Sequence, residues 1–366
     1  MILSELAQEL PDVEVEIVPR MSADKLAVAF AGGVAPDIVQ FSTRDAPRFI
    51  ANGLFVPLDL GVFGVSSRAE YARLWFPGAL GTMLLYDEIY FIPNEVTTFA
   101  TFYNVDMFTN AGLDKPPATW QGIGEVAKKL SILGPGGSWE RSGLALNHGG
   151  VWAAFHMVAM MRQNGVDWIS NEGTPNFTHP KALDALSVYA DLFLSGAANP
   201  DAGGSTFFEG NAAIYPGALY EHFALSNAEV SFTAGVSPYP VLAQGKPNSP
   251  SYAWGTFVTV QAEQPRLAWQ VAKFFSDQRW AEMWFGRSRL IPYDGEWLRR
   301  VYREEPTLRP FLDALQTSQV EISHPKYTEI VNFLSAADQD IIRRRAPLES
   351  ALEKLNQQLT ALLAGE

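Results

Sequence analysis

The most constraining feature of this sequence is the stretch over residues 31–59, AGGVAPDIVQFSTRDAPRFIANGLFVPLD. Its short apolar run, Asp37–Phe41, is bounded on both sides by turn-forming residues. Such a run predicts a buried strand of a parallel sheet. Ser42 follows as the expected N-cap of a helix that ends at Gly53, with Asp45 three residues after the cap.

The order of elements around this stretch favours an α/β fold. The alternating residues Val13–Val18 predict a half-exposed strand, and a helix is expected between it and the strand at Asp37–Phe41. Alternating strands and helices predict a parallel sheet with right-handed crossovers. Ligands of open α/β sheets bind where a strand leaves the sheet at its carboxyl end. The first candidate binding residues are therefore those of the following turn, Phe41, Ser42, Arg44 and Asp45.

The length and charge of the chain limit the classes of protein to which it can belong. Its 366 residues exceed what one hydrophobic core usually holds, which predicts two lobes. The net charge of −13 argues against nucleic acid and anionic membrane surfaces as partners, because both attract basic proteins. This charge does not restrict a small ligand, whose site can carry any local sign.

One residue type and two kinds of segment are missing from the sequence. It contains no cysteine, which excludes disulfides, thiolate metal sites and a cysteine nucleophile. No apolar run reaches the length of a transmembrane helix. The first twenty residues lack a basic segment followed by an apolar one, so no signal peptide is expected there.

Catalytic signatures are missing as well. The five histidines form no H-E-x-x-H pattern and no i,i+4 pair, so we expect no metal site. No G-x-S-x-G elbow, phosphate-binding loop or dinucleotide fingerprint occurs, so we expect no cofactor and no enzymatic activity. A glycoside hydrolase or lyase stays open as an alternative, because forty acidic residues offer many chance pairs of carboxylates.

Three stretches carry a family resemblance. In the first, the predicted strand leads through a polar turn and a helix to Gly53–Asp59, GLFVPLD. The second is YNVDMFTNAGLDKPPATW at Tyr103–Trp120, in which Val105 replaces the usual lysine. The third is FFEGNAAIY at Phe207–Tyr215. Together they resemble the carbohydrate-type extracellular solute-binding proteins of ABC importers, which are similar to maltose-binding protein.

The resemblance implies a type II periplasmic-binding-protein-like fold. In this fold, two α/β lobes with mixed parallel sheets are joined by multiple crossovers. We expect the first lobe at residues 1–102 plus 255–320, the second at 103–254 plus 321–366, and the ligand cleft between them. Family members begin with a strand before the first helix, and this sequence lacks that strand.

Sugar recognition indicates which residues would line such a cleft. A pyranose has apolar C–H faces that stack on aromatic rings, and hydroxyls that need hydrogen-bond partners once water leaves. An unpaired buried polar group costs about 1–3 kcal/mol, so a sugar site combines aromatic rings with carboxylates, amides and guanidinium groups. Besides the first turn, the candidates are Asn94, Glu95, Thr97, His148, Trp152, Tyr215, Gly217, Tyr220, Trp254, Gly255, Tyr293 and Tyr327.

Each candidate also has a plain structural interpretation. The turn at Ser42–Asp45 can serve as a helix cap with a surface ion pair. Trp152 can pack at the start of a helix, and Trp254, Tyr293 and Tyr327 can lie in the core or on the surface.

The resemblance implies the substrate-binding component of an ABC transporter, which binds a sugar or oligosaccharide as its lobes close. Its partners would be the sugar and the permease subunits, with no nucleic acid. We expect a monomer in the periplasm or outside the cell, tethered to the membrane. A binder of glycerol 3-phosphate or a glycerophosphodiester stays open, with Arg44 on the phosphate, as does a non-binding sensor.

Overall fold

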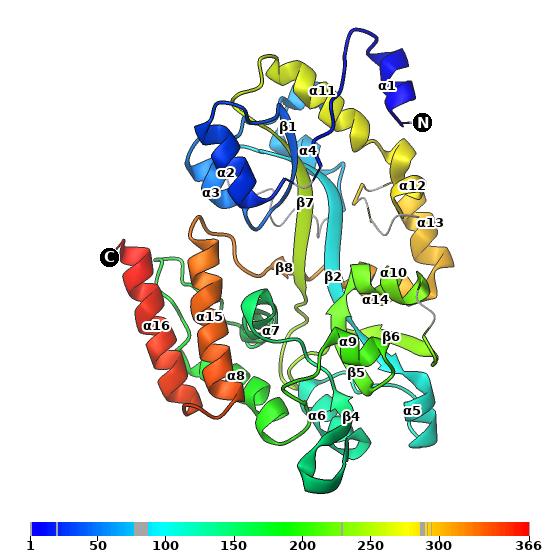
Figure 1. Cartoon of the computed structure of the whole chain (residues 1–366), viewed down its shortest axis with the longest axis vertical. Helices are drawn as coiled ribbons and strands as arrows, with labels where there is room; N and C mark the ends of the chain where they lie inside the picture. The colour runs from blue at the N-terminus through cyan, green and yellow to red at the C-terminus, as the bar shows by residue number, and fades with distance from the viewer. Residues whose placement is uncertain are drawn as a thin grey trace. The chain divides into compact units, whose positions relative to one another are not determined.

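The computed structural model describes residues 2–19, 21–76, 87–227, 230–285, 290, 292–293 and 295–365, which form two compact units (Figure 1). Unit 1 holds the residues up to Val96, Tyr252–Glu304 and Ile322–Tyr327. Unit 2 holds Thr97–Ser251, Glu305–Glu321 and the residues from Thr328 onward. The chain thus passes between the units five times. Residues 97–102 and 305–320, which we expected in the first lobe, belong to unit 2.

Three elements have residues in both units. They are strand β2 (Ile92–Asn104), strand β7 (Pro250–Val258) and helix α15 (Tyr327–Ile342). Within the part of the chain that the structure describes, no helix has the length and apolar character needed to cross a membrane.

Unit 1 is a set of short helices packed around an antiparallel strand pair. Its elements are α1 (Ile2–Glu9), α2 (Ala23–Ala31), β1 (Ile38–Ser42), α3 (Ala46–Ala51), η1 (Leu60–Phe63), α4 (Arg68–Ala72), α11 (Pro265–Phe275), η4 (Gln278–Trp280), α12 (Ala281–Phe285) and α13 (Glu296–Glu304). Aromatic side chains fill its core, because the rings of Phe41, Phe49, Phe55 and Phe257 contact one another. These contacts fix the position of β1 and of the turn that follows it.

The prediction of a parallel partner for β1 was wrong. β1 pairs antiparallel with β7, and Phe41 faces Gly255 in the register. The strand expected at Val13–Val18 does not form. Val13 and Val15 pack against the small cluster around Leu6, whereas Ile17 is 66% exposed. The alternating pattern of apolar residues therefore predicted an extended, half-buried segment correctly, but not a strand. A strand also needs a neighbouring strand with which to form hydrogen bonds.

The helix after β1 begins later than predicted. Ser42 is the last residue of β1, and Asp45 occupies the N-cap of α3 without a side-chain cap hydrogen bond. Pro47 lies in the first turn, where its missing N–H leaves no hydrogen bond unmade. The turn from residue 42 to 45 is consequently longer, and its polar groups are not used as caps.

Unit 2 contains a mixed sheet covered by longer helices. Its elements are α5 (Val105–Asn110), α6 (Trp120–Leu130), β3 (Ile132–Leu133), η3 (Pro135–Gly137), β4 (Trp139–Leu144), α7 (Gly150–Gln163), α8 (Pro180–Leu194), α9 (Gly204–Phe208), β5 (Ala212–Ala218), α10 (Leu219–Asn227), β6 (Ala234–Pro238), η5 (Pro306–Leu308), α14 (Arg309–Ala314), β8 (Gln319–Val320) and α16 (Leu348–Ala364). Thr119 caps α6, because its hydroxyl accepts from the Gly122 N–H at 3.2 Å.

The strand directions in unit 2 decide where its loops meet. β4 and β5 are parallel, with Leu144 opposite Ile214, whereas β2 runs antiparallel to both β5 and β6. The carboxyl ends of β4 and β5 therefore lie at the same edge. Helix α7 packs against α8, and nearly all its residues from Ala153 to Gln163 are buried. This helix starts at the same edge of the sheet, directly after the loop that leaves β4.

Candidate functional site

The carboxyl ends of β4 and β5 bring two predicted groups of residues together in unit 2. The loop after β4 carries Asn147 and His148. β5 passes directly into α10, and we call this junction, residues 217–221, the turn after β5; Gly217 lies at its strand end and Tyr220 in the first turn of the helix. The Asn147 amide Nδ2 donates to the hydroxyl of Tyr215 at 2.7 Å, which joins the two segments directly. Ends of neighbouring parallel strands are where open α/β sheets hold ligands.

A buried carboxylate completes this contact. The Tyr215 hydroxyl donates to Glu221 Oε1 at 2.5 Å, and the Ala218 N–H donates to Glu221 Oε2 at 2.7 Å. Glu221 is only 5% exposed. Burial raises the pKa of Glu221 to about 7, although the hydrogen bonds from Tyr215 and Ala218 act to lower it. Burial and the nearby Glu221 also raise the pKa of Tyr215 far above its ordinary value.

Two glycines give the carboxylate the room that it needs. A Cβ on Gly217 would lie 2.6 Å from Glu221 Oε2, and one on Gly204 would lie 2.8 Å from the Tyr215 hydroxyl. Glu221 stands in the first turn of α10, where an acidic side chain can accept from the N-cap N–H. Glu221 was missed in the sequence, although an acid in the first turn of an expected helix was a usable signal.

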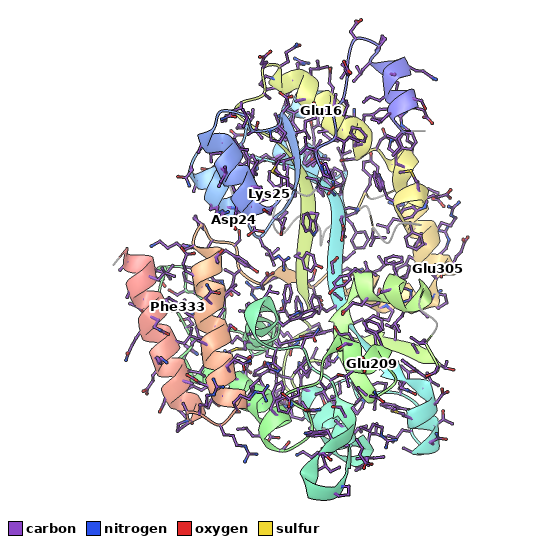
Figure 2. All side chains as sticks on the ribbon, in the orientation of Figure 1. Glu16, Asp24, Lys25, Glu209, Glu305 and Phe333 are labelled. Atoms are coloured by element: carbon purple, nitrogen blue, oxygen red, sulfur yellow. The ribbon has the colours of Figure 1, made fainter. Side chains whose placement is uncertain are left out.

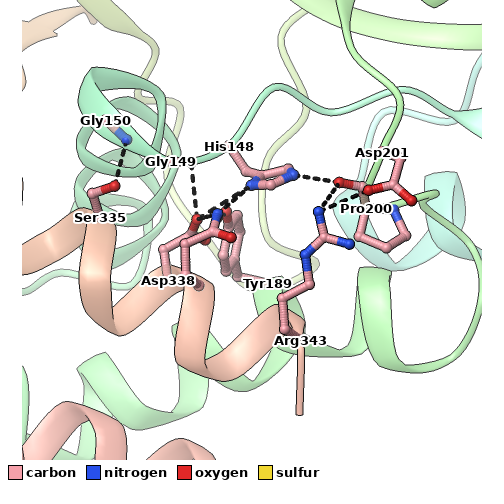
Figure 3. A network of polar contacts seen from close by, with 10 residues as sticks. His148, Gly149, Gly150, Tyr189, Pro200, Asp201, Ser335, Asp338 and Arg343 are labelled. Atoms are coloured by element: carbon pink, nitrogen blue, oxygen red, sulfur yellow. Dashed lines mark hydrogen bonds and ion pairs between the residues drawn. The ribbon is translucent and has the colours of Figure 1, made fainter. Parts of the chain in front are cut away.

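His148 belongs to a second polar network in unit 2 (Figure 3). Its Nε2–H donates to the Pro200 carbonyl at 2.6 Å, and the Gln339 amide lies 2.8 Å from Nδ1. Asp338, which is fully buried, accepts from the Gly149 N–H and the Tyr189 hydroxyl. Both ring nitrogens of His148 are therefore engaged by protein groups.

This network caps helix α7 from a distant part of the sequence. The first N–H groups of α7 have no partner inside the helix, and the cap residue Gly149 has no side chain. Asp338 and Ser335 of α15 accept from the N–H groups of Gly149 and Gly150. Helix α15 thereby fixes the loop that leaves β4. No sequence pattern indicated this role for Asp338.

Two opposing effects set the pKa of His148. Burial of the ring opposes its protonation. The hydrogen bond with Asp338, the Pro200 carbonyl and the charge of Asp338 together outweigh burial and raise the pKa above its ordinary 6.5. Asp338 Oδ2 lies 3.5 Å from His148 Nδ1, within reach of an ion pair when the ring is protonated.

In unit 1, the predicted turn after β1 contacts β7. The guanidinium of Arg44 lies over the ring of Tyr252 at 4.5 Å, and its Nε donates to the Ser42 hydroxyl. Ser42 is opposite Trp254 in the strand register. Burial raises the pKa of Asp45 although Arg44 acts to lower it. A half-buried cation, a carboxyl group and aromatic rings thus meet at one strand end.

The other candidates have varied surroundings. The ring of Phe41 and the whole of Thr97 are buried, as is Tyr215. The Asn94 amide donates to the Thr256 hydroxyl, and Glu95 is half-buried. Trp152 packs against Phe99 and stacks on His156, Gly255 lies against the Phe91 ring, Tyr293 packs edge-on against Trp75, and Tyr327 begins α15.

Two hollows in the described residues lie away from these groups. One of about 380 Å³ runs between α6 and α8 and is lined by Trp120, Gly124 and Asp191 among others. The second, of about 260 Å³, lies beside α11 and is lined by Glu9, Lys273 and Arg279 among others. Neither hollow is lined by a predicted binding residue.

Comparison with known families decides the class of this protein. The family described as "Bacterial extracellular solute-binding protein" matches residues 2–282. The chain belongs to this family. A protein of Brucella abortus (strain 2308) is 21% identical to this solute-binding protein over 357 residues, which cover 95% of this chain and 85% of that protein.

Solved structures share the fold of this solute-binding protein. The sugar-binding protein MalE of Xanthomonas citri has a TM-score of 0.83 at 21% identity, covering 100% of this chain and 93% of its own. UgpB of Mycobacterium tuberculosis, solved in complex with glycerophosphocholine, has a TM-score of 0.82 at 19% identity and covers 100% and 94%. The expected α/β, two-lobe solute-binding fold is therefore confirmed.

The described part of this solute-binding protein offers no group of side chains suited to binding a metal ion. Among the described residues, no three His, Asp or Glu side chains are grouped so that they could hold a metal ion. What the strand ends do offer is hydrogen-bonding amides, carboxyl groups, a guanidinium and aromatic rings.

Proposed function

We propose that this protein is the substrate-binding component of an ABC importer and binds a sugar or oligosaccharide without catalysing a reaction. The observation that carries the proposal is chemical. At a strand end of each unit, aromatic residues lie near carboxyl, amide or guanidinium groups, and among these aromatic residues Tyr220 of unit 2 is 40% exposed. Sugar faces and hydroxyls require this combination of residue types. The sugar-binding MalE, which has the same fold, supports this substrate class.

In the proposed mechanism, the two units close on the ligand. A ligand that contacts both units only in the closed form shifts the population toward that form. Arg44, Asp45, Asn94 and Trp254 would contribute from unit 1, and the loop after β4 and the turn after β5 from unit 2. The closed form would then dock on the permease from the periplasm or the outer face of a membrane, as a tethered monomer.

A second candidate ligand is glycerol 3-phosphate or a glycerophosphodiester. The solved UgpB with glycerophosphocholine shares the fold, and Arg44 offers a planar guanidinium of the kind that pairs with phosphate. Arg44 already lies over Tyr252, so it is held at the strand end rather than in free solution.

A thermal-shift screen separates these ligand classes. Malto- and manno-oligosaccharides, glycerol 3-phosphate and glycerophosphocholine are added to the purified chain, and each mixture is then analysed for products by chromatography. A sugar that raises the melting temperature and is recovered intact supports the proposal. Recovery of shorter sugars would indicate a hydrolase, and no shift with any compound would indicate a non-binding sensor.

Tyr220 offers a direct test of the proposed sugar contact. It is 40% exposed in the first turn of α10, and we expect Tyr220→Ala to weaken sugar binding roughly tenfold through loss of ring stacking. Calorimetric titration measures the dissociation constant. The matched control is Tyr302→Ala on α13, since Tyr302 is 39% exposed. Equal affinities of both variants would remove Tyr220 from the site.

A further inference from the structure

The Glu221 carboxyl group is buried and accepts hydrogen bonds only from neutral groups within the part of the chain that the structure describes. Among the described residues, no lysine, arginine or histidine forms an ion pair with it. Tyr215 of β5 faces the Glu221 carboxyl group. Tyr220 of α10 acts electrostatically to raise the pKa of Tyr215. His222, the next residue of α10, packs against Phe223 and Phe311 instead.

The remaining elements around Glu221 present neutral groups. Helix α9 presents the backbone of Gly204, and the loop after β4 presents Asn147. The orientation of the Asn147 amide is fixed, because its Oδ1 accepts from the Gly204 N–H at 3.1 Å while its Nδ2 donates to Tyr215. The row Asn147, Tyr215, Glu221 therefore ties together three segments of unit 2.

Both protonation states of Glu221 can keep these partners. The carboxylate accepts from the Tyr215 hydroxyl and the Ala218 N–H. The neutral acid can accept from Ala218 and donate to the Tyr215 oxygen once that hydroxyl rotates. The difference is the charge, because only the carboxylate must hold an unpaired charge away from water. Opening of the turn would hydrate that charge.

We propose that Glu221 is a proton-sensitive positioning residue that holds the turn after β5 against the loop after β4, more firmly when neutral than when ionised. Because Gly217 and Tyr220 belong to the same β5–α10 junction as Glu221, ligand affinity should fall as the pH rises through neutrality. This second part rests on the proposed function, whereas the first part concerns the unliganded protein. The pKa of about 7 places the change near neutral pH.

Protonation of Glu221 and closure of the turn after β5 are coupled, and the pKa shift gives the sign and the size of the effect. The pKa is raised in the folded state from 4.5 to about 7, so the closed turn is favoured fully below pH 4.5 and loses that advantage as the pH rises through 7. Between about pH 6 and about pH 8.5, the ratio of closed to open turn should fall about tenfold.

Hydrogen exchange of the unliganded protein tests the first part. We expect the protection of the Ala218 amide, corrected for the intrinsic effect of pH, to be about tenfold lower at about pH 8.5 than at about pH 6. Glu221→Gln, a neutral mimic, should remove this difference. Glu209→Gln is the matched control, because Glu209 is exposed at the end of α9 in the same unit (Figure 2).

A second variant keeps the test decisive if Glu221→Gln folds poorly. Tyr215→Phe removes a donor that lowers the pKa of Glu221, so the change in protection should move to higher pH. Equal protection of Ala218 in the wild type at both pH values would overturn the proposal. The same fall in Glu221→Gln as in the wild type would do so as well.

Calorimetric titration with the best sugar from the screen tests the second part. We expect affinity about three- to tenfold weaker at about pH 8.5 than at about pH 6 in the wild type, and no such change in Glu221→Gln. If the wild type binds the sugar equally well at both pH values, the proposed pH dependence of affinity is wrong, while the proposed function stays intact. If no sugar binds at all, the proposed function fails, while the exchange experiment still decides the role of Glu221.

Discussion

At the scale of single residues, unit 2 places several ionisable groups where water cannot reach them. Asp338 is fully buried and accepts from both Tyr189 and Gly149, and Glu221 is held between Tyr215 and Ala218. Buried polar groups of this kind are costly unless each of their hydrogen bonds is made. Substitution of these buried groups should therefore lower the free energy of unfolding more than substitution of surface charges does.

Asp338 offers a matched pair of variants on one helix. Asp338→Ala leaves the Tyr189 hydroxyl and the Gly149 N–H without an acceptor, and we expect a loss of roughly 3 kcal/mol in the free energy of unfolding. Asp340→Ala removes only a partly exposed ion pair with Lys354, which should cost less than about 1 kcal/mol. Urea unfolding measures both. Similar losses would show that the Asp338 hydrogen bonds contribute little.

His148 should make stability depend on pH. Its pKa is raised above 6.5, so its contribution is complete below pH 6.5 and is lost as the pH rises through the folded-state pKa. We expect His148→Ala to cost more free energy of unfolding at about pH 5.5 than at about pH 8.5. Urea unfolding at both pH values measures the difference. In an Asp338→Asn background the pH dependence should shrink, and an unchanged dependence would contradict the assignment to this pair.

At the scale of elements, close packing of α6 on β4 fixes one side of unit 2. A Cβ on Gly143 of β4 would overlap the backbone carbonyl of Ala127 in α6, and backbone cannot move aside as a flexible side chain can. The strand that ends at the candidate site is thus packed closely on α6 through a glycine. Element positions in this unit depend on such contacts as much as on the pattern of apolar residues.

Gly143→Ala should therefore be strongly destabilising. We expect a loss of about 3 kcal/mol or more, measured as a shift in the urea midpoint. Gly32→Ala is the control, because its φ of −83° suits alanine and a Cβ there would lie 3.5 Å from its nearest neighbours. That variant should unfold within about 1 kcal/mol of the wild type. A tolerated Gly143→Ala would mean that α6 can shift on the strand.

At the scale of the whole molecule, five passages of the chain connect two compact units. Proteins built from two bodies with short connections can bend at those connections while each core stays folded. The proposed closure on a ligand requires such a motion. Because the sequence contains no cysteine, engineered cysteines can report it without competing labels.

Energy transfer between two dyes should detect this closure. One dye is attached at Val28→Cys in unit 1, where Val28 is 72% exposed, and the second at Glu209→Cys in unit 2. We expect a saturating ligand from the screen to change the transfer efficiency. A pair placed within unit 2, at residues 209 and 354, should stay unchanged. Binding without any change in the first pair would contradict the closure mechanism.

Much of the element pattern was predictable because it depends on local chemistry. Thr119 caps α6, and Asp37–Phe41 predicted a strand within one residue of β1 at each end. The strand partner of β1 was not predictable, since a partner distant in sequence leaves no mark on the local pattern. The same reason hid Asp338, which caps a helix nearly two hundred residues earlier.

The sequence by itself determined the family, the α/β class and the two strand-end segments of unit 2 that carry the candidate chemistry. These follow from short-range patterns, which capping, turn formation and burial impose directly. Only the tertiary structure decided that Asn147 meets Tyr215 and Glu221, and that Asp338 fixes the loop beside them. Those contacts join segments far apart in the chain, and burial of their polar groups depends on how the whole unit packs.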